Sequence, residues 1–222
     1  MTRALLVVDM QKDSLAGGFY AVPSIGDVIA NVQRLADAFR ARRLPVVYTQ
    51  HTYCPDGSDL QRGEPVDPGG APIAYREGSE GWELIDELRP RPGDVVVRKH
   101  RWNAFAGSRL DTVLRKLRVD EVVVTGVTTD CCVMLTTFDA WFHEYGVVLV
   151  PDATAAASEG SHQAAVLTML NWLYDLRLVT TEGFVRELEG GPPTGLRARG
   201  PNAFAFEPEM LAEVYRRAVG GA

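Results

Sequence analysis

Short apolar runs alternate along the chain with longer stretches in which apolar residues recur at helical spacing. The runs have the valine-rich composition of strands and cover residues 4–8, 45–50, 94–99, 121–126, 146–150 and 177–180. Helical spacing is present at residues 23–43, 82–88, 108–117, 161–174 and 208–219, and a further helix follows the fourth run to about residue 143. The pattern therefore predicts strands and helices in regular alternation.

This alternation is typical of a parallel sheet with helices on both faces. The run Val122–Val124 is apolar at every position, as expected of a strand that is buried on both sides. We predict an α/β protein, a three-layer α/β/α Rossmann-like domain whose six-stranded sheet is mainly parallel and whose crossovers are right-handed. Residues 1–190 form this domain. Residues 191–222 are expected to form a C-terminal extension with one helix, which packs on the same domain or at an oligomer interface.

Composition and charge narrow the function classes. With 222 residues and 46% hydrophobic content, the chain is expected to form one soluble domain with a sizeable core. The net charge of −6, without a basic run, argues against nucleic acid as a partner, and no apolar segment reaches membrane-spanning length. The three cysteines, Cys54, Cys131 and Cys132, make no disulfide framework, and the apolar start is too short for a signal peptide. We expect a cytoplasmic protein.

Residues 121–140 are expected to form a buried strand, a turn of small residues and the beginning of a helix. Gly126 ends the strand, and the Thr-Thr-Asp sequence at 128–130 consists of residue types that cap helices. Cys131 or Cys132 then falls in the first helical turn, where free N–H groups and the helix dipole favour negative charge. We expect a thiol in that position to be biased toward the thiolate.

Chemically reactive residues stand at or just after three of the predicted strands, namely Asp9, Lys99 and Cys132. An isolated Asp after a strand is more often a turn residue. Ligands of open parallel sheets bind beyond the carboxyl ends of the strands, however, and a thiol, a proton acceptor and a cation together make an activated nucleophile without histidine. In a Rossmann-like strand order the strand of Lys99 lies about 10 Å from that of Asp9, so the cation needs a long stem.

Three motifs resemble those of the isochorismatase-like hydrolases. They read Leu-Leu-Val-Val-Asp9-Met-Gln, Val-Val-Arg-Lys99-His-Arg-Trp-Asn-Ala-Phe-Ala-Gly-Ser and Thr-Gly-Val-Thr-Thr-Asp-Cys-Cys132-Val, and the resemblance spans roughly residues 4–155. The cysteine-bearing branch of this family includes nicotinamidases and N-carbamoylsarcosine amidases. The resemblance implies that Asp9, Lys99 and Cys132 form the family's catalytic triad.

The resemblance also separates the two adjacent cysteines. The family's nucleophile directly precedes a valine, which selects Cys132 and makes Cys131 a neighbour that we expect to be small and buried. The family's cis peptide bond falls on Val127–Thr128. A non-proline cis bond costs about 2.5 to 4 kcal/mol, so this one is expected to aim backbone groups at the oxyanion.

Substrate contacts are expected from residues near the strand ends. Gln11 belongs to the first motif, and Trp102 and Phe105 lie in the polar and aromatic loop after the third strand. The family commonly has a phenylalanine that lines the pocket shortly after Gln11, whereas this chain has Asp-Ser-Leu there. Residues that compensate for it are Leu15, Phe19 or Tyr20. Arginines that are candidates for a substrate carboxylate are Arg62, Arg76 and Arg101.

No metal ion and no cofactor are expected. Residues 51–80 are rich in proline and glycine and form a long excursion, which is typical of functional or disordered loops. Candidate ligands there are His51, Cys54, Asp56 and Asp59, but their spacing matches no zinc pattern. Nicotinamidases carry Asp-x-His after the second strand, where this chain reads Thr-Gln-His51-Thr-Tyr-Cys.

The sequence thus predicts a cysteine-dependent hydrolase of a small carboxamide or N-carbamoyl (ureido) C–N bond, which acts through a thioester. Its partners are expected to be the small substrate and further copies of itself, as a dimer or tetramer. Two alternatives remain. One is vinyl-ether hydrolysis of the isochorismatase type, with Asp9 as the acid and no need for a thiol. The other is a catalytically silent binding protein on the same fold.

Overall fold

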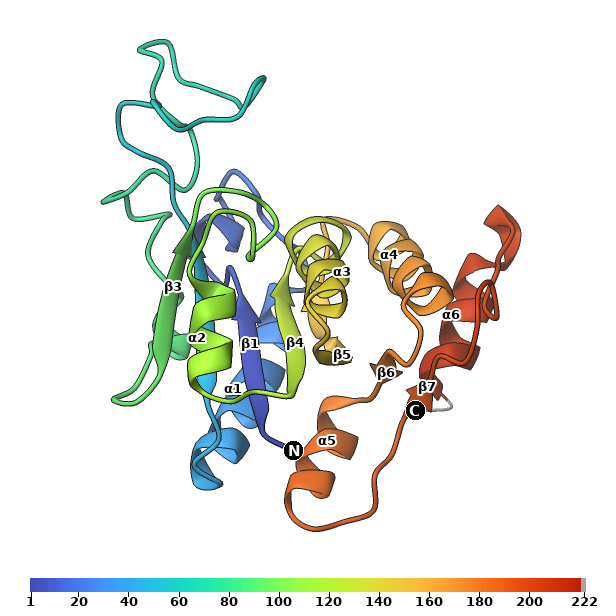
Figure 1. Cartoon of the computed structure of the whole chain (residues 1–222). Helices are drawn as coiled ribbons and strands as arrows, with labels where there is room; N and C mark the ends of the chain where they lie inside the picture. Colours follow the sequence, from blue (N-terminus) through green and yellow to red (C-terminus); the bar gives the residue numbers. More distant parts are fainter. Residues whose placement is uncertain (221–222) are drawn as a thin grey trace.

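Strand β1 (Arg3–Val8) lies in the middle of the sheet. The computed structural model describes residues 1–220, and the strands follow the order β3-β2-β1-β4-β5-β6-β7 (Figure 1). The remaining strands are β2 (Val46–His51), β3 (Val95–Lys99), β4 (Glu121–Val127), β5 (Gly146–Ala155), β6 (Arg177–Leu178) and β7 (Leu196–Arg197). All neighbouring strands pair in parallel except β6 and β7, which confirms the predicted α/β class.

Alternate residues of β1 face opposite layers of helices. Leu5 and Val7 share a core with α1 and α5, whereas Leu6 and Val8 share one with α2, α3, α4 and α6. The helices are α1 (Ile25–Ala41), α2 (Leu110–Lys116), α3 (Met134–Phe142), α4 (Glu159–Trp172), α5 (Thr181–Leu188) and α6 (Leu211–Gly220). Burial of each such side chain stabilises the fold by about 1.5 to 3 kcal/mol. The sheet is therefore the middle of three layers.

The C-terminal segment folds back onto the domain. A 3-10 turn at Pro208–Met210 leads into α6, whose Val214 and Ala218 are buried in the core that includes α4 (Figure 1). The contacts of α6 within this chain are thus with its own α4. None of the helices in residues 1–220 is long and apolar enough to cross a membrane.

Some elements differ from the sequence-based predictions. Residues 82–88 contain only the 3-10 turn Asp86–Leu88 rather than a helix, and β5 continues beyond Val150 to Ala155. The sheet has a seventh strand, β7, in addition to the six expected. Because β7 has two residues and pairs antiparallel with β6, it depends on tertiary packing and leaves no period in the sequence.

The long segment between β2 and β3 lies above the carboxyl edge of the sheet (Figure 1). Residues 11–13, which directly follow β1, form hydrogen bonds with this long segment. Gln11 and Leu84 form a β-bridge, the Asp13 amide donates to the Gly81 carbonyl at 2.9 Å, and Asp13 Oδ2 accepts from the Tyr75 amide at 2.7 Å. These contacts explain how a segment without a hydrophobic period of its own acquires a fixed path beside the strand ends.

Gly126 lies inside β4 instead of ending it, and it lies against β1. Its φ is 104°, and a Cβ added there would lie 2.1 Å from the Val8 carbonyl oxygen. A side chain would push apart the two strands that lead to Asp9 and to the turn of Cys132. Glycine is therefore required at this position.

We expect Gly126→Ala to lower the free energy of unfolding by more than about 2 kcal/mol, because it adds both a clash and an unfavourable φ. Chemical denaturation measures this change. Gly160→Ala in α4 is the matched control, since nothing lies within 4 Å of an added Cβ there. The control is expected to be neutral or more stable by up to about 1 kcal/mol. Equal stabilities of the two variants would contradict the assignment.

Candidate active site

Asp9, Lys99 and Cys132 meet at the carboxyl edge of the sheet. Asp9 follows β1, Lys99 is the last residue of β3, and Cys132 lies in the turn after β4. Lys99 Nζ is 2.7 Å from Asp9 Oδ2 and 3.6 Å from Cys132 Sγ. The exposed fractions are 1%, 0% and 9% for Asp9, Lys99 and Cys132, so the three groups interact out of contact with bulk water.

The strand order explains why the cation is a lysine. Strand β2 separates β1 from β3, so the backbones of Asp9 and Lys99 are about 10 Å apart at normal strand spacing. The four-carbon stem of Lys99 crosses this distance beneath β2. A shorter side chain at the end of β3 would not reach the carboxylate.

The Lys99 ammonium has several acceptors besides the carboxylate. His51 Nδ1 lies 2.9 Å from Nζ, and the carbonyl oxygens of Arg101 and Trp102 lie at 2.9 and 3.1 Å, so the three N–H donors are shared among these acceptors and Asp9. Burial lowers the pKa of Lys99, but the charges and hydrogen bonds of Asp9 and Cys132 outweigh burial and raise it. Lys99 is therefore a fixed positive charge at the centre of the site.

Thr49 fixes the second oxygen of the Asp9 carboxylate. Thr49 Oγ1 donates to Asp9 Oδ1 at 2.7 Å and accepts from the Asp9 amide at 3.2 Å. Asp9 itself has a φ of 48°, in the left-handed region that few side chains adopt. Sequence reasoning missed Thr49, although a polar residue within the otherwise apolar Val-Val-Tyr-Thr run was a usable signal.

Cys132 lies in a π-helical turn at Thr129–Val133 that precedes α3. The adjacent Cys131 thiol and burial raise the pKa of Cys132 well above the usual range, and the Lys99 charge offsets this only in part. Of the two thiols expected at this helix end, Cys131 has a pKa lowered by its hydrogen bond with Cys132, whereas Cys132 does not show the expected shift toward the thiolate, because burial opposes the Lys99 charge. Cys131 is half-buried, not fully buried as expected.

The turn before Cys132 has an irregular backbone. The Val127–Thr128 peptide bond is cis. The Thr128 carbonyl oxygen accepts from the amides of Cys131 and Val133, both at 3.1 Å. These two bonds hold the nucleophile turn close to the end of β4.

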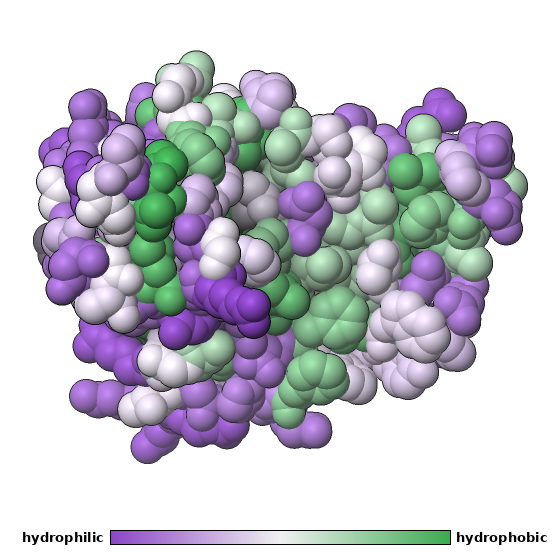
Figure 2. Space-filling view, turned by 90° about the horizontal axis from the view of Figure 1, so that it is seen from above, coloured by the Kyte–Doolittle hydropathy of each residue, from purple (hydrophilic) through white to green (hydrophobic). Residues whose placement is uncertain are grey.

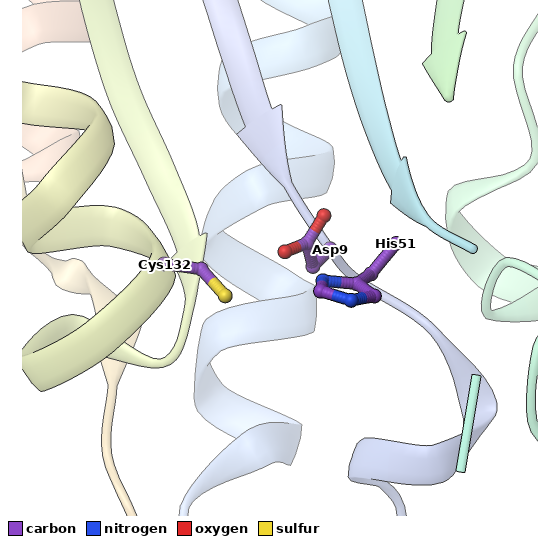
Figure 3. Close-up of side chains that lie close together, drawn as sticks. All are labelled: Asp9, His51 and Cys132. Carbon is purple, nitrogen blue, oxygen red and sulfur yellow. The ribbon is translucent and has the colours of Figure 1, made fainter. Parts of the chain in front are cut away.

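His51, the last residue of β2, points toward Asp9 and Cys132 (Figure 3). It is 1% exposed, and burial together with the Lys99 charge lowers its pKa to about 2. Since Nδ1 of the neutral ring accepts from Lys99, the ring proton lies on Nε2. Among the described residues Nε2 has no hydrogen-bond partner. The sequence indicated His51 only as a ligand in a cluster that does not form.

One group of side chains meets the distance requirement for a metal ion. Ligand atoms of Asp9, His51 and Cys132 lie within 4.8 Å of one another (Figure 3). The Lys99 ammonium, however, contacts all three at 2.7, 2.9 and 3.6 Å. A metal cation would meet a like charge in the same place, so this donor set does not fit a metal while Lys99 is charged. Asp59 pairs with His100 at 2.7 Å instead of joining His51.

Aromatic rings form one wall of the site. Tyr20 stacks on Tyr75 at 5.4 Å between centroids, and Tyr75 lies 5.0 Å from the His51 ring, which contacts Tyr53 at 4.7 Å. Burial and then the charges of Cys132 and Asp9 raise the pKa of Tyr75. Tyr75 comes from the long segment and was not predicted, whereas Tyr20 was.

The other predicted substrate residues have different surroundings. The Gln11 amide donates to the carbonyls of His51 and Trp82 at 2.9 and 2.8 Å and accepts from the His51 amide at 2.8 Å. Gln11 is fully buried and braces the backbone, because all of these contacts are to main-chain groups.

Trp102 and Phe105 belong to the same loop, but their side chains have different surroundings. The carbonyl of Trp102 holds Lys99, and its side chain is 44% exposed at the surface. Phe105 stacks on His143 at 4.9 Å and belongs to the core on the α3 side. Phe105 shares this core with Leu110 and Leu114 of α2, so its ring packs between helices of the domain.

Comparison with known proteins identifies the family of this chain. The sequence model of the isochorismatase domain matches residues 3–181. The chain belongs to the isochorismatase family. This confirms the resemblance read from the three motifs. The matched residues include all three strands that lead to Asp9, Lys99 and Cys132, and they end before α6.

Several relatives are similar over most of their length. Ureidoacrylate amidohydrolase RutB of Pseudomonas syringae pv. syringae (strain B728a) is 36% identical over 195 residues, which are 77% of this chain and 79% of the relative. A cysteine hydrolase from Pseudomonas syringae pv. phaseolicola 1448A has a TM-score of 0.78 at 32% identity, covering 85% of this chain and 92% of that one. N-carbamoylsarcosine amidase from Thermoplasma acidophilum has a TM-score of 0.69 at 30% identity, covering 82% and 98%.

The raised pKa of Cys132 predicts how the free protein reacts with iodoacetamide. The thiolate fraction is small at neutral pH, so alkylation of Cys132 is expected to accelerate by about tenfold per pH unit between pH 7 and 9. Peptide mapping by mass spectrometry measures it.

Lys99→Met is expected to slow this labelling at each pH, because it removes the charge that favours the thiolate. Lys116→Met, at an exposed position of α2, is the matched control. A labelling rate that stays constant from pH 5 to 8 would show that Cys132 is already ionised and contradict the prediction.

Proposed function

We propose that this protein is an amidohydrolase of non-peptide C–N bonds, which cleaves a small carboxamide or N-carbamoyl (ureido) group through a thioester on Cys132. The observation that carries the proposal is the continuous buried contact of Asp9, Lys99 and Cys132. A carboxylate, a fixed cation and a thiol in contact provide a base, a charge stabiliser and a nucleophile.

The raised pKa of Cys132 defines the task of Asp9. Because the thiol is protonated at rest, Asp9 takes its proton as the sulfur attacks the carbonyl carbon and the C–S bond forms. Lys99 offsets the negative charge that remains at the site throughout this transfer. Thr49 and Lys99 each hold one carboxylate oxygen, so the base is oriented before the substrate arrives.

The tetrahedral intermediate places a negative charge on the former carbonyl oxygen. Backbone N–H groups of the turn at Thr128 and Cys132 are our candidates for its donors, and such a donor is worth about 2.7 to 4 kcal/mol in other acyl-transfer enzymes. Asp9 returns the proton to the leaving nitrogen as the C–N bond breaks. Asp9 then accepts a proton from water, which attacks the thioester carbon, and it returns this proton to the Cys132 sulfur as the C–S bond breaks.

A ureido compound is the substrate class that we favour. Two of the relatives carry names that refer to ureido compounds, ureidoacrylate and N-carbamoylsarcosine. The stacked Tyr20 and Tyr75 rings offer a flat wall, which suits a planar ureido group. The free Nε2–H of His51 adds a hydrogen-bond donor on the same side, suited to an oxygen of the substrate.

The two alternatives fit the site less well. Vinyl-ether hydrolysis needs Asp9 as an acid but no thiol, whereas in this site the Cys132 sulfur lies 3.6 Å from Lys99 Nζ, which also contacts Asp9. That reaction leaves Cys132 without a task. A binding protein would have no need of a buried thiol beside a buried ion pair, which is costly unless it is compensated.

Exposed apolar residues support self-association as a dimer or tetramer. In Figure 2 hydrophobic residues gather toward the half of the molecule that contains α3, α4 and α6. The large exposed side chains on and directly after α3 and α4 are Leu135, Phe142, Trp172 and Tyr174. A further copy of the chain that covers them would remove this surface from water.

The thioester scheme predicts that Cys132→Ser loses at least about 10³-fold in turnover, because the hydroxyl is a far weaker nucleophile. Ammonia release measured across carboxamides and ureido acids identifies the substrate, and intact mass of a quenched reaction detects the acyl-enzyme. Cys131→Ser is the matched control and is expected to remain active. Near-full turnover by Cys132→Ser would overturn the scheme, and turnover of isochorismate in place of amides would support the ether alternative.

His51 tests the substrate contact. His51→Leu is expected to raise KM by about tenfold, because it removes the Nε2–H donor, whereas His51→Asn retains an amide donor and is expected to lose less. With a pKa of about 2 the ring stays neutral, so the activity of the wild type is expected to show no histidine titration between pH 5 and 8. Steady-state kinetics with a thermal melt for each variant measures this. An unchanged KM in His51→Leu would remove His51 from the binding site.

A further inference from the structure

A second buried chain of hydrogen bonds ends on the nucleophile turn. The Tyr215 hydroxyl in α6 lies 2.7 Å from His162 Nε2 in α4, and His162 Nδ1 lies 2.9 Å from Thr129 Oγ1. Thr129 is the first residue of the turn that carries Cys132. The chain thus connects the C-terminal helix with the catalytic centre through one side chain.

The side chains of Thr129 and His162 in this chain of hydrogen bonds are buried. Thr129 is fully buried and has no bulk water as a replacement partner, whereas His162 is 7% exposed and lines the same surface pocket as Tyr215. Burial lowers the pKa of His162 although Glu159 and Asp130 raise it, so the ring is neutral and has one donor and one acceptor. Thr129 and Tyr215 satisfy both nitrogens.

The polar contact of Tyr215 with the rest of the fold is the hydrogen bond between its hydroxyl and His162. Tyr215 is half-buried and lines a surface pocket with Asp27, Asp152 and Glu159, so its hydroxyl is not enclosed by packing. Its ring meets His162 edge-on, with centroids 5.4 Å apart. Tyr215 also lies beyond residues 3–181, which are the part that matches the isochorismatase domain.

We propose that His162 and Tyr215 are positioning residues that hold Thr129 and, through it, the turn that presents Cys132. The C-terminal extension thereby sets the reactivity of the nucleophile without contacting substrate. Loss of the hydroxyl of Tyr215 frees one side of the His162 ring, and the ring then orients Thr129 less strictly. For turnover this inference rests on the proposed amidase function, but for the reactivity of the Cys132 thiol it does not.

Tyr215→Phe tests the outer contact, because it keeps the ring and removes only the hydroxyl. We expect kcat and the rate of Cys132 alkylation to fall about 3- to 10-fold, the range of one hydrogen bond, with KM and the melting temperature unchanged. Tyr145→Phe is the matched control, since its hydroxyl donates to Asp111 Oδ1 at 2.8 Å and belongs to no part of this chain of hydrogen bonds. It is expected to leave kcat and the alkylation rate unchanged.

Two substitutions of His162 separate its two contacts. The amide of His162→Asn can replace Nδ1 and keep the bond to Thr129, whereas the longer amide of His162→Gln replaces Nε2 and keeps the bond to Tyr215. Since the inner contact holds the turn, His162→Asn is expected to retain more kcat and faster alkylation than His162→Gln.

A double-mutant cycle tests whether Thr129 and Tyr215, the two ends of this chain of hydrogen bonds, act together. Thr129→Val removes the inner acceptor and donor, so Tyr215→Phe is expected to have little further effect on alkylation in the Thr129→Val background. Wild-type alkylation and kcat in Tyr215→Phe, or fully additive effects of the two substitutions, would overturn the positioning role. If the wild type hydrolyses no amide but Tyr215→Phe still slows alkylation, the proposed function fails and the positioning role stands.

Discussion

The site depends on the interaction of the buried Lys99 ammonium with the groups that compensate its charge. An unpaired buried charge is far too costly to retain, so the groups around it are those that compensate it: the Asp9 carboxylate, the His51 ring nitrogen and two main-chain carbonyls. Burial and the same charge keep His51 neutral, and the ammonium occupies the place that a metal cation would need. One cation thus contacts the carboxylate, the imidazole and the thiol of the site.

The site is assembled from elements that each have a separate structural support. Gly126 allows β4 to approach β1, so that the nucleophile turn and Asp9 begin from adjacent strands. Segment 11–13 fastens the long segment that brings Tyr75 beside His51. The turn of Cys132 is supported on its other side by α4 and α6. The catalytic geometry is therefore a property of the whole fold.

The state of the thiol follows from a competition between burial and charge. Desolvation and the neighbouring Cys131 raise the pKa of Cys132, and Lys99 opposes them. In the mechanism that we propose, a base must therefore act in the same step as the attack of the protonated thiol. Asp9, with Thr49 and Lys99 on its two oxygens, is oriented for that step.

The sequence by itself determined the alternation of strands and helices, the fold class and the three residues at strand ends, because periodicity, valine-rich runs and motifs are local properties. It also placed Tyr20 and the C-terminal helix. Tertiary structure alone decided that β7 pairs with β6, that Phe105 packs in the core and that Gln11 braces the backbone.

Contacts between residues that are distant in sequence form only in the folded chain. The contacts of Thr49, His51 and Tyr75 join residues that are distant in sequence, and although the polar Thr49 stands out in an apolar run, no local pattern indicates its partner. The sequence also could not say which of the two adjacent thiols has the lowered pKa, since desolvation is a property of everything packed around a group. The sequence names the reactive groups, and the fold decides their surroundings and hence their protonation.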